Sequence, residues 1–153
     1  MAEIEVGSAP QRVAPAGGAP ELSIVVTLLN EAATLEELHR RTVDALEGLG
    51  RSFELIYVDD GSTDGTFAAL ERLHAGDARV RAVRLKRNVG QHPAMHAGLA
   101  RARGAIVVTM DGDLQNPPED LPRLVEGVDA GFDVASGRRA ARHDSWGRTL
   151  PSR

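Results

Sequence analysis

The chain of 153 residues contains no cysteine, which excludes disulfide bonds, thiolate nucleophiles and zinc–cysteine centres. Aromatic residues make up only 3% and the formal net charge is −4, and both values argue against a nucleic-acid partner. The longest apolar runs, at residues 24–29 and 105–110, have the length of strands and fall far short of the roughly 20 residues that a membrane helix needs. Neither a G-x-G-x-x-G sequence nor a P-loop sequence is present.

What the chain does contain is typical of a soluble domain, with 42% apolar and 26% charged residues. Residues 1–20 are rich in Ala, Pro and Gly, carry Glu3 and Glu5, and lack the basic start and apolar centre of a signal peptide. We therefore expect residues 1–20 to be a disordered tail.

The charge is unevenly distributed along the chain. Residues 1–78 hold 5 basic and 14 acidic side chains, whereas residues 79–153 hold 13 basic and 8 acidic ones. Between residues 79 and 103 there are seven basic residues and no acidic one. Such a segment forms either a solvated basic face or a surface for an anionic ligand such as a phosphate, and the pattern leaves both interpretations open.

Apolar runs alternate with helical patterns along the chain. Continuous runs at residues 24–29, 53–58 and 105–110 predict buried strands, and the apolar–basic alternation at 80–85 predicts an edge strand or a strand with one exposed face. A last short strand is expected at 132–136. Between the strands we expect helices, with a capping box of Thr34 and Glu37 and with caps at Asp64 and Asn116. The fold class is therefore α/β, with a mainly parallel central sheet covered by helices on both faces.

Polar residues follow each expected strand except the last. Because ligands of such sheets bind outside the carboxyl ends of the strands, these residues are expected to converge on one site. They are Asn30 and Glu31, Asp59 and Asp60, Arg87, Asn88 and Gly90, and Asp111 and Asp113.

The pair Asp111 and Asp113, with Gly112 between them, follows a buried strand. Two adjacent carboxylates repel each other unless a cation joins them, and hard oxygen ligands suit Mg²⁺ or Mn²⁺. The alternative is a solvated turn. Asp60, in the turn at residues 59–66, is placed to accept hydrogen bonds from a ribose or a base. His92 and His96 lie four residues apart, but without the Glu of a zinc-peptidase motif they do not indicate a metal site.

Six segments, at 24–31, 54–66, 87–100, 107–122, 134–139 and 144–148, together resemble the nucleotide-sugar half of a family 2 glycosyltransferase with the GT-A fold. VDDGSTDGT (58–66) and MDGDLQNPPE (110–119) are the most specific of these motifs. The segment DLQNPPE (113–119) is similar to the branch that makes dolichyl- and undecaprenyl-phosphate sugars. Thr27 stands where the family usually has Pro.

The resemblance implies a role for each matching residue. Asp111 and Asp113, with Gln115 as a possible further ligand, would bind Mg²⁺ or Mn²⁺, and Asp113 would thereby take part in catalysis. Arg138, Arg139 and Arg148 would contact the phosphates of donor or acceptor. The nucleotide sugar would be bound by Leu28, Asn30, Glu31, Asp60, Arg87, Gly90 and Asp111.

The implied reaction is the inverting transfer of a sugar from a nucleotide-diphosphate sugar, similar to UDP-glucose or GDP-mannose, to a polyprenyl phosphate at the cytoplasmic face of a membrane. We expect residues 21–137 to bind the nucleotide sugar and residues 138–153 to be a basic segment leading into a missing acceptor region. Family members continue with that region and usually with membrane helices. This chain is therefore expected to retain binding of donor and metal better than catalysis of sugar transfer.

Alternative functions remain. A catalytically incomplete nucleotide-sugar-binding fragment would share every motif, and a family 2 enzyme acting on a saccharide acceptor would share most of them. A phosphotransfer receiver domain is disfavoured because its acidic pair follows the first strand, not the second. A haloacid-type phosphatase is disfavoured because Leu114 and Gln115 follow the D-x-D pair where that family has Thr or Val. The sequence does not predict the oligomeric state.

Overall fold

The computed structural model describes residues 18–137. Within them, four strands form one fully parallel sheet in the order β3-β2-β1-β4. Its elements are β1 (Leu22–Leu28), α1 (Leu35–Glu47), β2 (Phe53–Asp59), α2 (Thr66–Gly76), β3 (Val80–Arg84), α3 (Gln91–Leu99), β4 (Ile106–Asp111), the short 3₁₀ helix η1 (Pro118–Asp120) and α4 (Leu121–Asp129). The expected α/β class, the parallel sheet and the edge position of β3 are confirmed.

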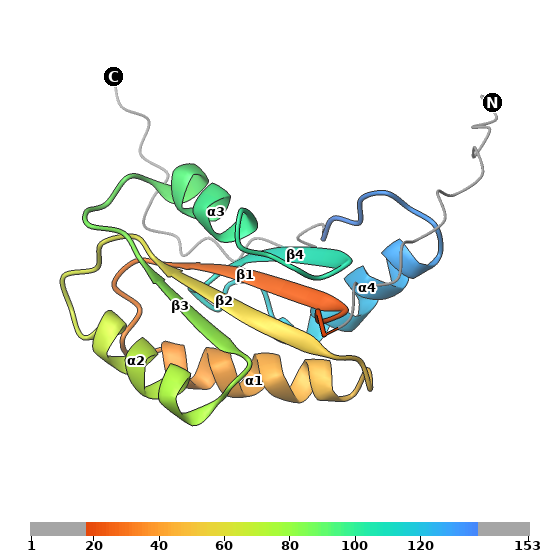
Figure 1. Cartoon of the computed structure of the whole chain (residues 1–153), viewed down its shortest axis with the longest axis horizontal. Helices are drawn as coiled ribbons and strands as arrows, with labels where there is room; N and C mark the ends of the chain where they lie inside the picture. The colour runs from red at the N-terminus through yellow and green to blue at the C-terminus, as the bar shows by residue number, and fades with distance from the viewer. Residues whose placement is uncertain (1–17, 138–153) are drawn as a thin grey trace, which may run out of the picture.

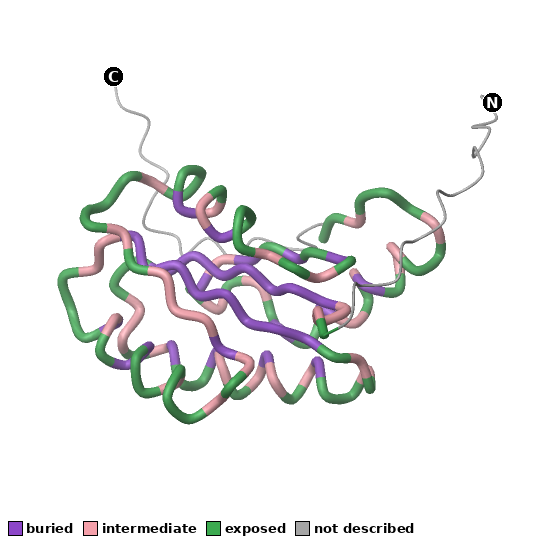
Figure 2. The backbone as a smooth tube through the Cα atoms, in the orientation of Figure 1, coloured by how far each residue is buried: buried purple, intermediate pink, exposed green. Residues whose placement is uncertain are grey.

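Helices cover both faces of the sheet, as Figure 1 shows. One face packs against α1, α2 and α4 through the main apolar core, which includes Ile24, Leu55 and Leu121. The other face carries α3, which packs over β1 and β2 through a smaller cluster around Val25 and Ile56. The two central strands are buried along their whole length (Figure 2) because apolar layers lie on both of their faces.

The amino-terminal edge of the sheet contains a buried carboxylate. Glu54 is 2% exposed and accepts hydrogen bonds from the Ser23 hydroxyl at 2.7 Å and from the backbone N–H of Arg103 at 2.9 Å. The guanidinium groups of Arg103 and Arg81 also contact it, at 2.8 and 3.2 Å. Burial by itself raises the pKa of Glu54, but the hydrogen bonds from Arg103, Ser23 and Arg81 outweigh burial and hold the pKa below its ordinary value.

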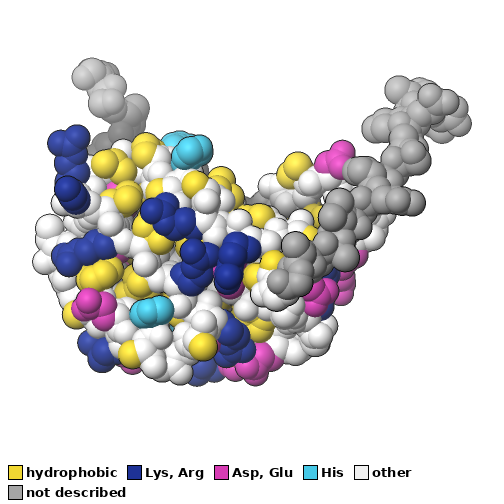
Figure 3. Space-filling view, viewed as in Figure 1, with side chains coloured by type: hydrophobic (Ala, Val, Ile, Leu, Met, Phe, Trp, Pro, Cys, Tyr) yellow, Lys and Arg dark blue, Asp and Glu magenta, His cyan; other side chains and the backbone are white. Residues whose placement is uncertain are grey.

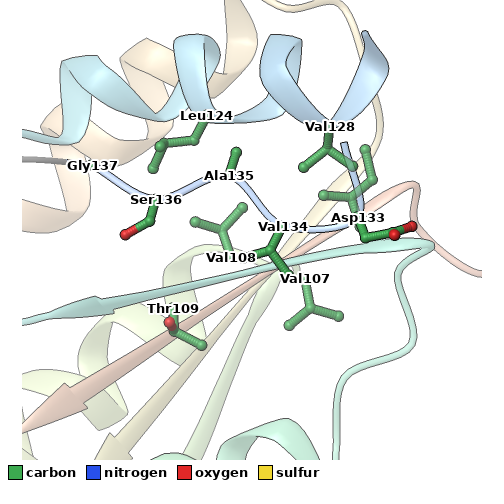
Figure 4. A pocket seen from close by; sticks show the side chains of 11 residues that line it. Val107, Val108, Thr109, Leu124, Val128, Asp133, Val134, Ala135, Ser136 and Gly137 are labelled. Atoms are coloured by element: carbon green, nitrogen blue, oxygen red, sulfur yellow. The ribbon is translucent and has the colours of Figure 1, made fainter. Parts of the chain in front are cut away.

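The strand expected at residues 132–136 is absent, so that prediction is wrong. Residues 132–137 run as an irregular segment between β4 and α4, beside a groove of about 270 Å³ that Val107, Leu124 and Val134 help to line (Figure 4). Val134 is 80% exposed and Phe132 is 63% exposed. An apolar run forms a strand only when it pairs with a neighbouring strand, and this segment pairs with none in the described part of the chain.

Two of the expected helix caps are also wrong. Thr34 accepts no capping hydrogen bond from α1: its backbone is helical (φ −106°, ψ −18°) where an N-cap residue is typically extended, and its hydroxyl donates to Glu31. Within residues 18–137 no side chain caps η1 or α4, where Asn116 was expected. Among residues 18–137, no helix combines the length and the apolar character needed to span a membrane. Residues 1–17 of the expected tail lie outside the described residues.

Candidate nucleotide-sugar and metal site

The carboxyl ends of all four strands lie side by side. In the strand registers Leu28 is opposite Asp59, Thr27 is opposite Asp111, and Asp59 is opposite Arg84. The loops that follow these strands therefore meet at one edge of the sheet, as the parallel topology requires. This arrangement brings together the residues that the sequence assigns to nucleotide-sugar and metal binding within residues 18–137.

The loops after β1 and β2 are joined by side chains. Asn30 adopts a left-handed backbone conformation with φ of +58°, which directs the chain toward the second loop. Five hydrogen bonds that involve side chains connect the two loops. They are Asn30 N to Ser62 Oγ at 2.9 Å, Glu31 N to Thr66 Oγ1 at 2.8 Å, Ala32 N to Asp64 Oδ2 at 3.2 Å, and the N–H and hydroxyl of Thr63 to Asn30 Oδ1 at 2.9 and 3.4 Å. The amide oxygen of Asn30 is thus already engaged within the protein.

Asp64 was expected to cap α2; the N-cap is Gly65 and has no side-chain cap, but Asp64 accepts the N–H of Thr66, the first residue of the helix, and also anchors the loop after β1. Its Oδ1 accepts the Thr66 N–H at 2.9 Å and the Thr66 hydroxyl at 2.5 Å, while its Oδ2 accepts the Ala32 N–H. The hydrogen bonds from Thr66, together with that from Ala32, lower the pKa of Asp64. One carboxylate thus contacts the first residue of α2 and the loop after β1, so both contacts depend on its ionised form.

Replacing Asp64 with alanine is expected to loosen the loop after β1 without unfolding the chain, because Asp64 itself is exposed. Hydrogen exchange measured by NMR should accelerate at the amides of Ala32 and Thr66, and nucleotide affinity should fall several-fold. Asp44→Ala, which removes only an exposed ion pair with Arg40, is the matched control. Unchanged exchange at Ala32 in Asp64→Ala would contradict the anchoring role.

Asp60 is buried and connects β2 to the loop before α3. It is 3% exposed, and its two carboxylate oxygens accept the backbone N–H groups of Val89 and Gly90 at 2.8 and 2.9 Å. Gly61 (φ +71°) lies so close to this loop that a Cβ atom would sit 2.4 Å from the carbonyl carbon of Arg87. Only glycine fits there, so the two loops form one packed unit.

Asp59, beside it, is fully buried. Its Oδ1 accepts the Ser62 N–H at 3.0 Å, while its Oδ2 has no hydrogen-bond partner among residues 18–137 and lies 3.9 Å from Arg84 Nε. The Arg84 guanidinium stacks 4.4 Å above the ring of Phe67. Arg84 thus places a positive charge near the unpaired oxygen and compensates part of its cost of burial.

Asp111, the last residue of β4, and Asp113, in the turn that follows, differ in their surroundings. Asp111 is partly buried, and its Oδ1 accepts a short hydrogen bond from the side-chain amide of Gln91. Asp113 is exposed, and its Oδ1 accepts the backbone N–H of Gln115 at 3.0 Å in a tight turn where Leu114 has φ of +58°. Gly112 is buried against β1, where a Cβ atom would lie 2.4 Å from Leu28 Cδ2. The turn therefore presents Asp113 to solvent.

These two carboxylates suit a small divalent cation. Hard oxygen ligands are what Mg²⁺ and Mn²⁺ prefer, and both ions commonly take one or two protein carboxylates and fill their other positions with water and substrate phosphate. Residues 18–137 contain no group of three or more His, Cys, Asp or Glu side chains placed to hold a metal ion, so Asp111 and Asp113 would supply only part of an ion's coordination. The donor set fits an ion shared with a bound diphosphate.

A bidentate ion pair fixes the chain beyond these aspartates. The Arg41 guanidinium donates to both carboxylate oxygens of Glu119, at 2.8 and 2.7 Å. Its hydrogen bonds hold the pKa of Glu119 at about 2, well below the ordinary value. The helix η1, which follows the Asp113 turn, is therefore anchored to α1.

The basic residues between 79 and 103 divide into two groups. Four of the seven, Arg79, Arg81, Arg84 and Arg103, lie beside carboxylates. The other three form no ion pair within residues 18–137: Arg101 donates to the carbonyl of Ala97, and Lys86 and Arg87 are exposed. On the face of the molecule that Figure 3 shows, Lys and Arg side chains are spread over the surface. Lys86 and Arg87 lie in the loop before α3, at the carboxyl edge of the sheet, where an anionic ligand would lower their mutual repulsion.

Several assigned residues have other positions or remain untested. Leu28 is 1% exposed and its side chain belongs to the main core, so its contact with a nucleoside stays a prediction. His92 and His96 are exposed on α3. Arg138, Arg139 and Arg148, and the whole segment 138–153, lie outside the described residues.

Gln91, Ser62, Asp64 and Thr66 escaped the sequence assignment of binding residues. Their side chains make the contacts that organise the edge of the sheet, yet each of those contacts joins residues 20 or more positions apart or depends on a turn geometry. Only Asp64 carried a signal in the sequence, as a helix cap.

Comparison with known proteins decides the family. The profile of glycosyl transferase family 2 matches residues 23–153. The chain belongs to this family.

Curated relatives of this family 2 chain include two bacterial proteins named undecaprenyl-phosphate 4-deoxy-4-formamido-L-arabinose transferase. One, from Pseudomonas aeruginosa, is 50% identical over 133 residues, which cover 86% of this chain and 39% of the relative. The other, from Edwardsiella ictaluri, is 46% identical over 133 residues and 41% of its length. The family 2 chain thus spans about two fifths of the relatives that it matches.

Solved structures agree with this family and show the GT-A fold. A mannosyltransferase from Pyrobaculum calidifontis in complex with GDP-Man and Mn²⁺ matches with a TM-score of 0.54 and 29% identity, over 74% of this chain and 33% of that one. Glucosyl-3-phosphoglycerate synthase from Mycobacterium tuberculosis, in complex with Mn²⁺, UDP and phosphoglyceric acid, matches with a TM-score of 0.58 and 31% identity, over 73% of this chain and 40% of that one.

Proposed function

We propose that this chain is the donor-binding part of an inverting glycosyltransferase that moves a sugar from a nucleotide-diphosphate sugar to a polyprenyl phosphate. The observation that carries the donor part is the meeting of Asp111, Asp113 and the Arg87 loop at one edge of the sheet. The acceptor class is inferred from the names of the relatives, which act on undecaprenyl phosphate.

In this proposal each group has a distinct task. Asp111 and Asp113, with Gln115 as a further candidate, hold Mg²⁺ or Mn²⁺, which when bound offsets the negative charge of the departing nucleoside diphosphate. Asp60 fixes the loop that contains Arg87 and Gly90, so that Arg87 is presented to the nucleotide. Arg138, Arg139 and Arg148 are proposed to contact phosphate.

The chemistry is a single displacement at the anomeric carbon of the sugar. A phosphate oxygen of the acceptor forms the new bond while the bond to the nucleoside diphosphate breaks, and the configuration inverts. Because a polyprenyl phosphate is already anionic, the reaction needs less help from a general base than transfer to a sugar hydroxyl does.

The donor is proposed only as a class. UDP-glucose and GDP-mannose fit the sequence, and the relatives are named for 4-deoxy-4-formamido-L-arabinose. A second candidate function is donor binding without transfer, which requires only the donor and metal groups at the carboxyl edge of the sheet.

A transfer assay separates the two candidates. The chain is incubated with Mn²⁺, a short polyprenyl phosphate and each of three donors: UDP-glucose, GDP-mannose and 4-deoxy-4-formamido-L-arabinose linked to a nucleoside diphosphate. Mass spectrometry of the lipid reports transfer, and calorimetry reports donor binding. Transfer supports the full proposal, binding without transfer supports the second candidate, and a folded chain that binds none of the donors contradicts both.

A further inference from the structure

The first residue of α3 reaches across the sheet to a proposed metal ligand. The side-chain amide of Gln91 donates a short hydrogen bond to Oδ1 of Asp111. Asp111 Oδ2 has no hydrogen-bond partner among residues 18–137, and Asp111 forms no ion pair there. The contact joins α3 to the end of β4. The main packing contacts of α3 with the sheet are with β1 and β2.

The body of α3 is fixed on the sheet by close packing. Ala94 is fully buried between the helix and the strands. At Gly98 a Cβ atom would lie 2.3 Å from Val25 Cγ1 and 2.9 Å from Val58 Cγ2, so the helix sits at the closest approach that glycine allows. A helix packed this tightly has no room to slide or roll, and the position of its first residue is set accordingly.

The amino-terminal end of α3 is fixed separately. Asp60 binds the backbone N–H groups of Val89 and Gly90, and Gly90 turns into the helix with φ of +95°. Gln91 follows directly. Its backbone is therefore held from both sides, by the buried carboxylate before it and by the seated helix after it, although its side chain is exposed.

We propose that Gln91 is a positioning residue for Asp111. Resting on the proposed function, this inference assigns Gln91 the task of holding one carboxylate oxygen so that the other is available to a divalent cation. An amide suits the task because it donates a hydrogen bond without adding a positive charge, whereas Lys or Arg at this position would compete with the cation. Fixing the ligand in advance removes the cost of ordering it when the ion binds.

The first test measures Mn²⁺ affinity by electron paramagnetic resonance of the whole chain with UDP present. Gln91→Ala is expected to weaken Mn²⁺ binding by about tenfold, the effect typical of lost partners of metal ligands. Gln91→Asn, whose amide is one methylene shorter, should show a similar loss. His92→Ala changes the neighbouring exposed residue, which has no contact with Asp111, and should leave the affinity unchanged.

Two further measurements exclude a merely structural role. Thermal unfolding of metal-free Gln91→Ala should match the wild type, because the side chain is exposed. Without metal, the NMR signals of the Gln91 side-chain amide should have different chemical shifts in the wild type and in Asp111→Asn.

The outcomes distinguish this inference from the proposed function. The inference is overturned, and the proposed function stands, if the wild type binds Mn²⁺ and Gln91→Ala binds it equally well. The same holds if the chemical shifts of the Gln91 side-chain amide are unchanged in Asp111→Asn. If the folded wild type does not bind Mn²⁺ at all, the proposed metal site fails and the inference fails with it.

Discussion

Replacing Asp113 with alanine is expected to abolish the metal-dependent part of nucleotide binding, with a loss of Mn²⁺ affinity of about 100-fold or more. The loss should exceed the 10- to 100-fold effects of partners that only orient a ligand, because a direct ligand is removed. Asp113 is exposed and its carboxylate contacts only the N–H of Gln115 among residues 18–137. The fold should therefore survive the change.

Calorimetry with UDP, with and without Mn²⁺, measures this effect. Asp133→Ala is the control, since Asp133 is an exposed carboxylate beside the groove along β4 and not at the carboxyl edge of the sheet. Full Mn²⁺-dependent UDP binding by Asp113→Ala would show that the cation, if bound, is held elsewhere. Asp111→Ala should behave as Asp113→Ala does.

Replacing Glu54 with alanine is expected to destabilise the fold by about 3 kcal/mol, as removal of one partner from a buried charged pair does. The change would leave the Ser23 hydroxyl and the Arg103 N–H without their shared acceptor inside the protein. The estimate is at the low end of such effects because the guanidinium groups of Arg81 and Arg103 reach solvent. Glu71→Ala, at an exposed position of α2, should change stability by less than about 0.5 kcal/mol.

The same carboxylate gives the stability a pH dependence. The pKa of Glu54 is lower in the folded protein than the unfolded value of 4.5, so folding favours its ionised form. Its contribution is complete above pH 4.5 and is lost as the pH falls through the folded pKa. Urea unfolding should therefore give a wild-type advantage over Glu54→Ala that is constant near neutral pH and shrinks below pH 4.5. An advantage that grows on acidification would contradict this account.

The sequence predicts the sheet well because its signals are strong and local. The buried run around Ile24 and the alternating run around Val83 each contain enough pattern to predict a strand and its place at the centre or the edge. Once the strands are known to be parallel, the convergence of Asp60 and Asp111 on one edge follows from topology alone.

The failures have a different origin. Residues 132–136 have the composition of a strand, but a strand also needs a partner strand. Within residues 18–137 this segment lies beside a groove next to β4 and pairs with no strand. Thr34 and Glu37 have the spacing of a capping box, but Thr34 has a helical backbone (φ −106°, ψ −18°) where an N-cap is typically extended. In both cases the pattern of residue types is present, and the pairing or the backbone geometry that it requires is not.

Side-chain contacts between loops were beyond the reach of sequence reasoning for the same reason. The Gln91–Asp111 contact spans 20 residues, the Asp64–Ala32 contact spans 32, and the Arg103–Glu54 contact spans 49. Nothing in the local sequence marks these residues as partners. The first two of these contacts hold site residues at the carboxyl edge of the sheet, and the third stabilises the amino-terminal edge.

The central claim is that the carboxyl edge of this sheet binds a nucleoside diphosphate together with a divalent cation. Calorimetric titration of the folded chain with UDP and with GDP, each in Mn²⁺ and again in EDTA, tests it most directly. The account predicts saturable binding of at least one nucleotide in Mn²⁺ and a loss of that affinity in EDTA. Absence of binding in Mn²⁺, or equal affinity in EDTA, would contradict it.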